Sequence, residues 1–590
     1  MRAAIAAATA AVLGSAGLAA IAVTQTASAA TTCSVGYSVN QWSTGFTASL
    51  TVTNGTTPIT GWTLSWTYTG NQALQNGWNG AWSQAGETVT VTNLSYNGSL
   101  AAGGATTLGA NFSYSGTNTT PASFTCTPTG APPTSSPPTT PPPTTPPPTT
   151  SPPTTPPPTS PPPTGTPKPH VADPFTGATQ FLDPEYTAQV NAQAAADSSA
   201  VEARVANNPT AYWLDTMASI AGGGTSGRLG LQTELNDALA KASSGPVTIE
   251  IVVYDLPGRD CAALASNGEI PATAAGLTTY EQNYINPIAS ILTQFENTNL
   301  RVVAIIEPDS LPNVVTNVNV KPNCNTSAPF YESGTTYALN QLHAIPNVYN
   351  YMDIGHSAWL GWPSNMSITP PVYNKVVQGT TAGYASIDGF ISDTANYIPT
   401  QEPLLTNPTL QVGGQPVDSA NFFQFNPTFD ELSYDTAMYN TLMSAGFPAS
   451  KRFLVDTGRN GFGPTHPTTI TSEPDVNTYV TANKIDSRPF RGDWCNINNS
   501  GIGARPADEP FGTSSPVMAY VWIKPPGYSD GDYPTSTHAH GDPHCDPAGT
   551  QTDGNGNTYP TDAIPGFDVP AGLWFPFEFQ MLVKNAFPAI

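Results

Sequence analysis

Acidic residues follow several apolar runs in the second half of the chain. Asp260 comes shortly after the run 247–253 (VTIEIVV), Asp309 follows 302–306 (VVAII), and Asp530 also lies beyond a strand-like run. Acids that converge on one site raise one another's pKa, so that one stays protonated while another is ionised. Two such carboxyl groups are what cleavage of a glycosidic bond needs. Helix capping and ion pairing are the structural alternative for any single Asp.

The apolar runs themselves predict the elements that hold these acids. Between them lie helix-like segments, such as the amphipathic stretch 279–296. Buried parallel strands that alternate with helices are typical of an α/β fold, and we expect residues 170–590 to form a distorted parallel β/α barrel. In such barrels the chemistry sits at the carboxyl ends of the strands. That is where the acids fall.

Composition limits the possible partners. The chain has 590 residues, a formal charge of -23 and only 10% charged residues. Binding to nucleic acid needs concentrated Lys and Arg, so nucleic acid is excluded as a partner. The charge suits a protein that acts on an uncharged partner.

The N-terminal residues 1–30 have the layout of a secretory signal peptide. One Arg precedes a long Ala-rich apolar run, and Ala27-Ser28-Ala29 offers a cleavage site of small residues. A permanent membrane anchor is the alternative, because the run approaches the length of a span. Export is favoured because Ala is only weakly hydrophobic. The mature protein is therefore expected to be secreted, extracellular and free of the membrane.

Two modules follow, joined by a linker. Residues 31–126 contain short alternating runs of Thr, Val, Ser and aromatic residues between Gly and Asn turns, which predicts an all-β sandwich. Trp62, Trp66 and Tyr68 alternate along one run, so we expect them in its core. Residues 127–169 consist almost entirely of Pro, Thr, Ser and Gly. They predict a semi-rigid polyproline tether.

The six cysteines suit an exported protein. They fall in three regional pairs, and neighbour pairing is the simplest of the 15 possible connectivities. Cys261 as a nucleophile is an alternative. A metal site in HAHGDPHC (residues 538–545) is a second one, because His538, His540, Asp542 and His544 alternate there. We expect neither a metal nor another cofactor.

The small module resembles the cellulose-binding branch of carbohydrate-binding module family 2. The resemblance rests on VNQWSTGFTASLTVTN, GWTLSW and SYNGSLAAGG. It implies a row of exposed aromatic rings that stack on cellulose, at Trp42, Trp78 and Tyr96. The family usually has Trp where this chain has Tyr96.

The large module resembles glycoside hydrolase family 6, the cellulases that cleave β-1,4-glucan with inversion. Four motifs occur in family order: VVYDLPGRDCAALASNGE, IIEPDSLPNVVTN, DIGHSAWLGWP and GDWCNINNSGIGARP. The resemblance implies disulfides Cys261–Cys324 and Cys495–Cys545, which leaves Cys33 with Cys126. The sequence departs from the family pattern at Tyr528, where family members usually have a Glu that binds sugar hydroxyl groups.

The resemblance also implies roles for individual residues. Asp309 matches the general acid, Asp260 the acid that keeps it protonated, and Asp530 the other proposed base. Ser266 matches a serine that places the water, and Tyr254 a tyrosine that distorts the sugar ring. The expected substrate-binding residues are Tyr254, Arg259, Ser266, Trp213, His356, Trp359, Trp362, Asn396, Trp494 and Lys524.

The family resemblance implies an open groove in endoglucanases and two covering loops in exo-acting members, and the large module is long for an open-groove member. The extra residues lie in 321–337 and 528–569, which we expect to be loops that cover the site. The prediction is a monomeric, processive cellobiohydrolase that releases cellobiose from non-reducing ends, with crystalline cellulose and cello-oligosaccharides as partners. An endoglucanase of the same family and a non-catalytic cellulose-adhesion protein remain the alternatives.

Overall fold

The computed structural model divides the chain into two compact units, Met1–Pro153 and Thr154–Ile590. The residues it describes are 33–41, 45–55, 57, 59–78, 80–93, 98, 100, 104–116, 118–129, 168–224, 227–463, 466–532, 540–553, 556–565 and 568–590. The predicted signal peptide and residues 130–167 of the predicted linker lie outside this set. Among the described residues, no helix is both long and apolar enough to cross a bilayer.

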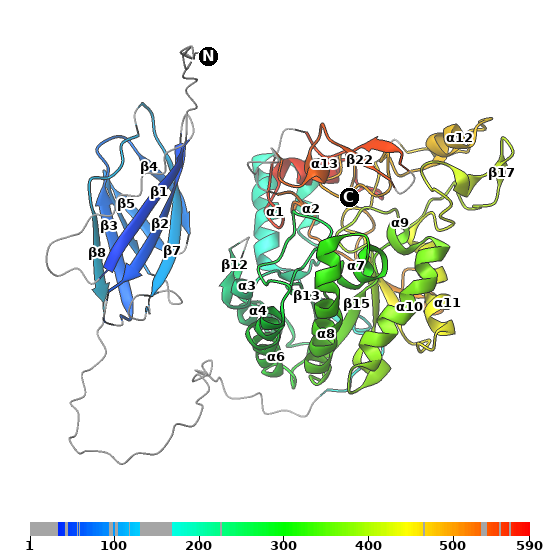
Figure 1. Ribbon diagram of the computed structural model, residues 1–590, viewed down its shortest axis with the longest axis horizontal. Coiled ribbons are helices and arrows are strands. Elements are labelled where there is room, and N and C mark those ends of the chain that lie inside the picture. The colour runs from blue at the N-terminus through cyan, green and yellow to red at the C-terminus, as the bar shows by residue number, and fades with distance from the viewer. Residues whose placement is uncertain are drawn as a thin grey trace, which may run out of the picture. The chain divides into compact units, whose positions relative to one another are not determined.

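The first unit is a sandwich of two antiparallel four-stranded sheets (Figure 1). One sheet has the order β1-β2-β7-β4 and the other β5-β6-β3-β8. The strands are β1 (Cys33–Gln41), β2 (Gly45–Asn54), β3 (Gly61–Thr67), β4 (Ala73–Trp78), β5 (Ala81–Ala85), β6 (Thr88–Thr92), β7 (Ala105–Ser113) and β8 (Phe124–Thr129). The sandwich predicted from the alternating runs is confirmed.

Aromatic side chains fill the space between the two sheets. Trp62, Trp66 and Tyr68 are at most 3% exposed, as their alternation along β3 predicts. Phe46 and Phe112 from the facing sheet stack on each other at 5.1 Å. The disulfide joins Cys33, the first residue of β1, to Cys126 within β8, and because these strands belong to different sheets it links the two layers.

The second unit is built on one twisted, mostly parallel sheet with the order β10-β13-β14-β15-β16-β19-β21-β20. Only β20 runs antiparallel to its neighbour, and β9 pairs with β13 off this path. The strands are β9 (Thr179–Gln180), β10 (Tyr212–Leu214), β13 (Val247–Val253), β14 (Leu300–Ile306), β15 (Val348–Asp353), β16 (Gly389–Ser392), β19 (Arg452–Asp456), β20 (Ala507–Asp508) and β21 (Val517–Val521).

The two ends of this sheet meet at a short seam, which makes it a distorted barrel. Beside β10, the Ala211 N–H donates to the Trp522 carbonyl beside β21 at 3.1 Å. The Trp213 indole N–H donates to the Ile523 carbonyl at 2.8 Å. These contacts replace a regular strand pair, so the predicted distorted β/α barrel is confirmed.

Helices such as α4, α6, α8, α10 and α11 flank the sheet, and others lie around the strand ends (Figure 1). They are α1 (Pro184–Ala196), α2 (Glu202–Val205), α3 (Met217–Ala221), α4 (Leu231–Lys241), α5 (Ala274–Thr279), α6 (Asn286–Thr293), α7 (Ser310–Asn317), α8 (Pro322–His343), α9 (Ser357–Leu360), α10 (Pro363–Gln378), α11 (Glu431–Ser444), α12 (Val476–Asn483) and α13 (Pro576–Lys584). A π-helical turn, η1 (Tyr280–Ile285), joins α5 to α6, so the predicted helix at 279–296 is part of one continuous helical segment. Short two-stranded hairpins are formed by β11 (Gly222–Gly223) with β12 (Arg228–Leu229), β17 (Gln411–Val412) with β18 (Gln415–Pro416), and β22 (Thr550–Thr552) with β23 (Thr558–Pro560).

One expectation about the extra residues was wrong. Residues 321–337 were expected to form a loop over the site, but from Pro322 onward they form the first part of α8. The helix is held by Cys324, which is 1% exposed and disulfide-bonded to Cys261. The sequence is poor in strong helix formers, and burial of residues such as Tyr331 and Leu339 overrides that local preference.

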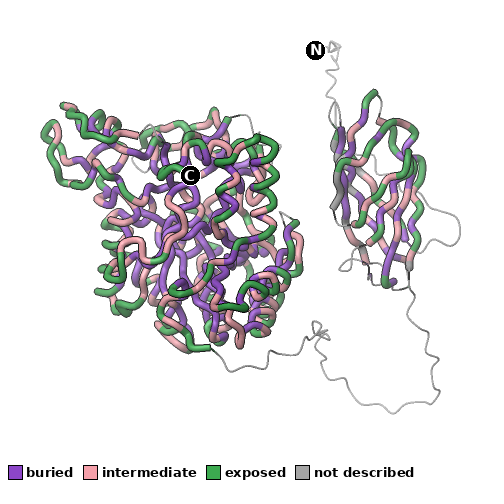
Figure 2. Tube along the Cα trace, turned by 180° about the vertical axis from the view of Figure 1, so that it is seen from behind, coloured by how far each residue is buried: buried purple, intermediate pink, exposed green. Residues whose placement is uncertain are grey.

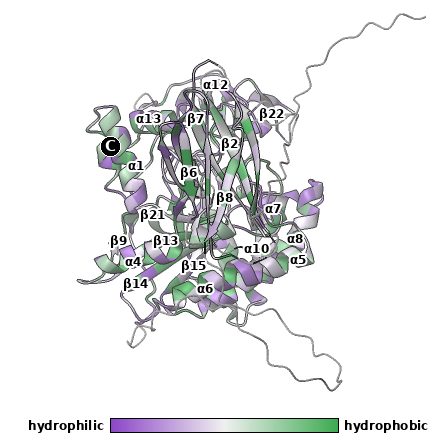
Figure 3. Cartoon of the chain, turned by 90° about the vertical axis from the view of Figure 1, so that its left-hand side faces the viewer, coloured by the Kyte–Doolittle hydropathy of each residue, from purple (hydrophilic) through white to green (hydrophobic). Residues whose placement is uncertain are grey.

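Apolar residues lie on both faces of the parallel sheet. All seven residues of β13 are buried, because side chains on one face fill the barrel and those on the other contact the helices. Buried residues therefore run through the middle of this unit (Figure 2), and flanking helices such as α10 alternate hydrophobic and hydrophilic residues along their length (Figure 3). This double layer fixes the strand ends that carry the candidate site.

Candidate active site

A pocket of about 530 Å³ opens at the carboxyl ends of the barrel strands. Segments that follow β13, β14, β15, β16 and β21 all contribute to its wall. Of the residues predicted from the sequence, those that line it are Trp213, Tyr254, Arg259, Asp260, Ser266, Asp309, His356, Trp359, Asn396, Trp494, Lys524 and Asp530. Trp362 does not line it.

Asp309 lies at the start of α7, directly after β14. Its backbone N–H donates to Asp353 Oδ2 at 3.0 Å, which holds it in a left-handed conformation with φ of 63°. Burial raises the pKa of the Asp309 carboxyl well above its usual range, and the nearby charges of Asp260, Asp353 and Asp530 raise it further. The Asp309 carboxyl therefore keeps its proton to higher pH than an ordinary Asp does, as a general acid requires.

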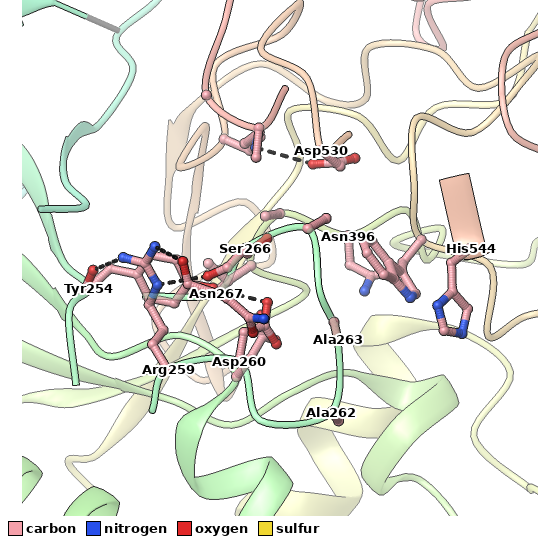
Figure 4. Close-up of a pocket in the computed structure, with 18 of the residues that line it drawn as sticks. Tyr254, Arg259, Asp260, Ala262, Ala263, Ser266, Asn267, Asn396, Asp530 and His544 are labelled. Carbon is pink, nitrogen blue, oxygen red and sulfur yellow. Dashed lines mark hydrogen bonds and ion pairs between the residues drawn. The ribbon is translucent and has the colours of Figure 1, made fainter. Parts of the chain in front are cut away.

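Asp260 and Ser266 lie on the loop that follows β13 (Figure 4). Burial raises the pKa of Asp260, while Arg259 and a hydrogen bond from the Ser266 hydroxyl act in the opposite direction. The Tyr254 hydroxyl donates to Asp260 Oδ2 over a long 3.4 Å. Asp260, Ser266 and Tyr254 thus form one connected group beside the acid Asp309.

Arg259 is adjacent to Asp260 in the sequence, and the family resemblance also implies that Arg259 holds this carboxylate; that expectation is corrected. No ion pair joins these two described residues. Instead, the Arg259 Nη1 donates to the carbonyls of Asp215 at 2.6 Å and Tyr254 at 2.5 Å, and its Nε donates to the Ser266 carbonyl at 2.9 Å. Its fixed planar donors fit backbone oxygens from three segments at once. Arg259 therefore shapes the loop and acts on Asp260 through its charge.

Asp530 is held as an ionised carboxylate. Burial would raise its pKa, but Arg459 at 2.6 Å and Lys524 at 3.1 Å lower that pKa below the usual value. The Tyr397 hydroxyl adds a hydrogen bond at 2.8 Å and the Asn496 N–H another at 3.2 Å. The pocket therefore combines a carboxyl group with a raised pKa, Asp309, and one with a lowered pKa, Asp530.

Left-handed backbone conformations gather around this pocket. Asp260, Asp309 and Ala395 line it with φ of 57°, 63° and 56°. Glu307 directly follows β14 and Asp393 directly follows β16, with φ of 50° and 58°. Non-glycine residues adopt such values rarely, and they cluster where function fixes the backbone. The strand ends are thus shaped to present these side chains.

Three of the predicted tryptophans present rings to the pocket. Trp213 crosses the Tyr254 ring at 5.4 Å, and the Trp359 indole N–H donates to Thr316 Oγ1 at 2.8 Å. Trp494 lies 5.4 Å from the His544 ring. The Trp362 indole N–H donates to the Gln424 carbonyl at 2.8 Å, away from the pocket lining. Flat rings anchored by one polar atom are suited to stacking on sugar rings.

His356 and Asn396 form a polar pair in the wall. Asn396 Nδ2 lies 3.1 Å from His356 Nε2. Burial lowers the pKa of His356 well below its usual value, and Arg488 and Arg491 lower it further. The imidazole is therefore neutral and, with the amide, can bond uncharged hydroxyl groups.

Two loops that line the pocket from distant parts of the chain are hydrogen-bonded to each other. Asp542 Oδ2 accepts the backbone N–H of Leu264 at 2.6 Å and that of Ala265 at 3.2 Å. Disulfides Cys261–Cys324 and Cys495–Cys545 brace the two loops, as expected. Cys261 is thus bonded to sulfur, and the alternative of a nucleophilic Cys261 is wrong.

The histidine-rich segment divides into separate pairs. His544 Nδ1 pairs with Asp542 at 2.7 Å, and His540 Nδ1 pairs with Asp568 at 2.6 Å. His538 lies outside the described residues. His540 and His544 thus each bind a different carboxylate, and these two described histidines do not converge on a single point as ligands of one metal ion would.

Sequence reasoning missed several residues of the pocket. Asn313 and Asn317 follow Asp309 at helical spacing on α7, a signal that could have placed them on the same wall. No pattern in the sequence indicated Arg459, because it is distant from Asp530 along the chain and only the fold brings the two side chains together. Tyr528, the departure from the family pattern, lines the pocket but is 5% exposed, and its hydroxyl donates to Gln189 at 2.9 Å.

The predicted cellulose-stacking row of the first unit is not described. Trp42 and Tyr96 lie outside the described residues. Trp78 ends β4, and its side chain is also outside this set. The row therefore remains a prediction.

Comparison with known proteins identifies both units. Residues 175–586 match the family model described as glycosyl hydrolases family 6. The chain belongs to this family. Residues 33–131 match the model of a cellulose binding domain. Both resemblances read from the sequence motifs are confirmed.

Similar proteins of this family are exoglucanases and cellobiohydrolases by name. Exoglucanase A of Cellulomonas fimi is 48% identical over 433 residues, which are 71% of this chain and 49% of that protein. The chain thus spans about half the length of that relative. Exoglucanase 3 of Agaricus bisporus is 36% identical over 71% of this chain and 80% of its own length.

Solved structures of the family share the fold of the second unit. The catalytic domain of Cellulomonas fimi Cel6B has 47% identity and a TM-score of 0.68, and the match covers 72% of this chain and 97% of that one. Cellobiohydrolase II (Cel6A) from Humicola insolens, in complex with glucose and cellotetraose, has 31% identity and a TM-score of 0.54. That match covers 71% and 99% of the two chains.

Proposed function

We propose that this protein is a secreted, inverting cellulase that hydrolyses β-1,4-glucosidic bonds and releases cellobiose from non-reducing chain ends. The observation that carries the proposal is that Asp309, with a raised pKa, and Asp530, paired with Arg459 and Lys524, line one pocket of a family 6 chain. One proton donor and one fixed negative charge are what an oxocarbenium-like transition state requires. Both lie among aromatic rings that suit a glucan.

In the proposed mechanism, Asp309 donates its proton to the oxygen of the bond that breaks. Asp260, Asp353 and Asp530 keep that proton on Asp309 until the substrate arrives, because each negative charge raises its pKa. After transfer, the same Lys524 that pairs with Asp530 stabilises the new carboxylate, since it lowers the pKa of Asp309. Tyr254 and Trp213 hold the sugar ring beside the acid.

We assign the role of base to Asp260, acting through water. Asp530 already forms ion pairs with Arg459 and Lys524 and accepts a hydrogen bond from Tyr397. Its lowered pKa makes it a weak proton acceptor. Asp260 has a raised pKa and a hydrogen bond from the Ser266 hydroxyl. A water beside Ser266 can attack the anomeric carbon and pass its proton towards Asp260. Asp530 then serves as fixed negative charge.

The joined loops support exo-action. Because Asp542 binds the backbone of Leu264 and Ala265, the two loops are joined beside the pocket, an arrangement that favours entry of a polymer chain by its end. An enclosed chain can be cut repeatedly without leaving the site. The names of the similar proteins agree with this mode.

The first unit is proposed to deliver this activity to the surface of cellulose. Its match to a cellulose binding domain supports that role, with Trp42, Trp78 and Tyr96 as the stacking row. The three disulfides suit an oxidising, extracellular location. A monomer is proposed because one pocket acts on one chain.

The test is chromatographic analysis of the products from crystalline cellulose, together with the viscosity of carboxymethylcellulose. Cellobiose as the dominant product with a slow fall in viscosity would support the cellobiohydrolase. Mixed longer oligomers and a rapid fall in viscosity would make the protein an endoglucanase. Binding to cellulose without any soluble sugar would make it an adhesion protein.

A further inference from the structure

An aromatic ring lies exposed on a turn within the long segment between β16 and α11. The Phe425 side chain is 64% exposed, although large apolar residues of this unit are otherwise mostly buried. Its backbone is left-handed with φ of 64°, and that of Gln424 is left-handed with φ of 53°. A bulky residue rarely adopts this conformation, and such backbone strain concentrates at ligand-binding positions.

The turn that carries Phe425 is fixed on both sides. Phe423 is fully buried and stacks on Phe429 with 3.8 Å between ring centroids. On the other side, Asn426 is also fully buried, and its Nδ2 donates to the Ser357 carbonyl at 2.7 Å. Phe425 is therefore an exposed ring on a rigid support, which loses little entropy when it binds a flat partner.

The same turn is attached to the aromatic residues that lead into the pocket. Asn426 contacts the first residue of α9, and Trp359 on that helix lines the pocket. Trp362 follows α9 and donates its indole N–H to the Gln424 carbonyl at 2.8 Å. Trp359, Trp362 and Phe425 are thus connected residues on one support, and the last of them is the most exposed.

We propose that Phe425 is an outer stacking platform for a β-1,4-glucan chain, outside the pocket and in continuity with Trp362 and Trp359. The proposal rests on the proposed function. The surrounding segment 421–428 (NFFQFNPT) has aromatic and amide side chains and no charged residue. Aromatic faces contact the C–H faces of uncharged sugar rings. A glucan is favoured over a charged protein surface for this reason.

The platform is most useful on an insoluble substrate. A chain held by Phe425 is guided from the cellulose surface towards the pocket, whereas a short oligosaccharide that fills the pocket does not reach the platform. Phe425→Ala should therefore lower the ratio of the initial rate on crystalline cellulose to kcat/KM on cellotetraose. We expect a fall of about three- to tenfold, the effect of losing one aromatic contact of roughly 1 kcal/mol.

The experiment uses the full chain and three variants. Phe425→Trp should keep the wild-type ratio, because it retains a flat ring at the same position. Phe577→Ala is the matched control, because Phe577 is also exposed, at 42%, but lies on α13 outside the pocket lining. Thermal denaturation of each variant shows whether the fold is kept. A folded Phe425→Ala with a lowered ratio, and controls with the wild-type ratio, would support the platform.

Other outcomes separate the two proposals. An unchanged ratio in folded Phe425→Ala, with cellulose still hydrolysed, would overturn the platform and leave the cellulase intact. A wild type that hydrolyses neither substrate would overturn the proposed function itself. The last measurement is sedimentation velocity of the wild type and of Phe425→Ala. A wild-type dimer that is lost in the variant would show that Phe425 contacts a second copy of the chain, and would overturn the glucan platform.

Discussion

The charge of Asp353 is predicted to set the upper pH limit of activity. Asp353 Oδ2 accepts the Asp309 N–H at 3.0 Å, so the two carboxyl groups lie within roughly 7 Å of each other. At an effective dielectric constant of about 20, one charge at that distance contributes ~2 kcal/mol, or between one and two pKa units. Asp353→Asn keeps the hydrogen-bond acceptor and removes only the charge.

The direction follows from the state that Asp309 needs. The acid must be protonated, and the charge of Asp353 raises its pKa. Without that charge the pKa of Asp309 falls, so activity is lost at lower pH than in the wild type. The pKa of Asp353 is itself raised to about 6 by burial, so its charge is present at the alkaline limb and is largely absent at low pH. The acidic limb of the plot of kcat/KM against pH should change little.

The assay is kcat/KM on a soluble chromogenic cello-oligosaccharide as a function of pH. The alkaline limb should move down by about one unit in Asp353→Asn. Glu250→Gln is the control, because Glu250 is a buried acid with a raised pKa of about 7 on β13, outside the pocket lining. An alkaline limb that stays in place in Asp353→Asn, or moves up, would refute the electrostatic account of Asp309.

Three further predictions follow from other contacts. Arg459→Met leaves Asp530 buried without its closest partner, so we expect a loss of about 3–5 kcal/mol in the free energy of unfolding, measured by urea denaturation; an unchanged midpoint would contradict the ion pair. Asp542→Ala removes the contact between the two loops, so the rate of viscosity loss in carboxymethylcellulose should rise while cellobiose release falls; if neither rate changes, Asp542 does not enclose the site. Tyr528→Phe removes one hydrogen bond to Gln189 and should cost about 1 kcal/mol of stability with little change in kcat; a large loss of kcat would give the Tyr528 hydroxyl a direct role.

The sequence predicted the strands and the acids that follow them, because buried parallel strands have a strong apolar signal and barrel sites lie at their carboxyl ends. Asp260, Asp309 and Asp530 all line one pocket for that reason. The cysteine pairs were also predicted, by neighbour pairing and, for the two disulfides of the large module, by the family resemblance.

The sequence could not predict contacts that only the fold creates. Arg459 follows β19 and reaches Asp530 beyond β21, and nothing in its own segment signals that meeting. Arg259 lies beside Asp260 in sequence, but its donors bind backbone carbonyls instead of the neighbouring carboxylate. Residues 321–337 lack a helical signal, and burial decides their conformation as part of α8.

The central claim is that Asp309 is the acid of an inverting reaction, and proton NMR of the products released from cellohexaose tests it most directly. Spectra recorded within the first minutes show the anomer that forms before mutarotation. The account predicts α-cellobiose from the wild type and a loss of rate of at least about a hundredfold in Asp309→Asn, the contribution expected of a general acid. Initial β-anomer, or an Asp309→Asn variant with near wild-type rate, would contradict it.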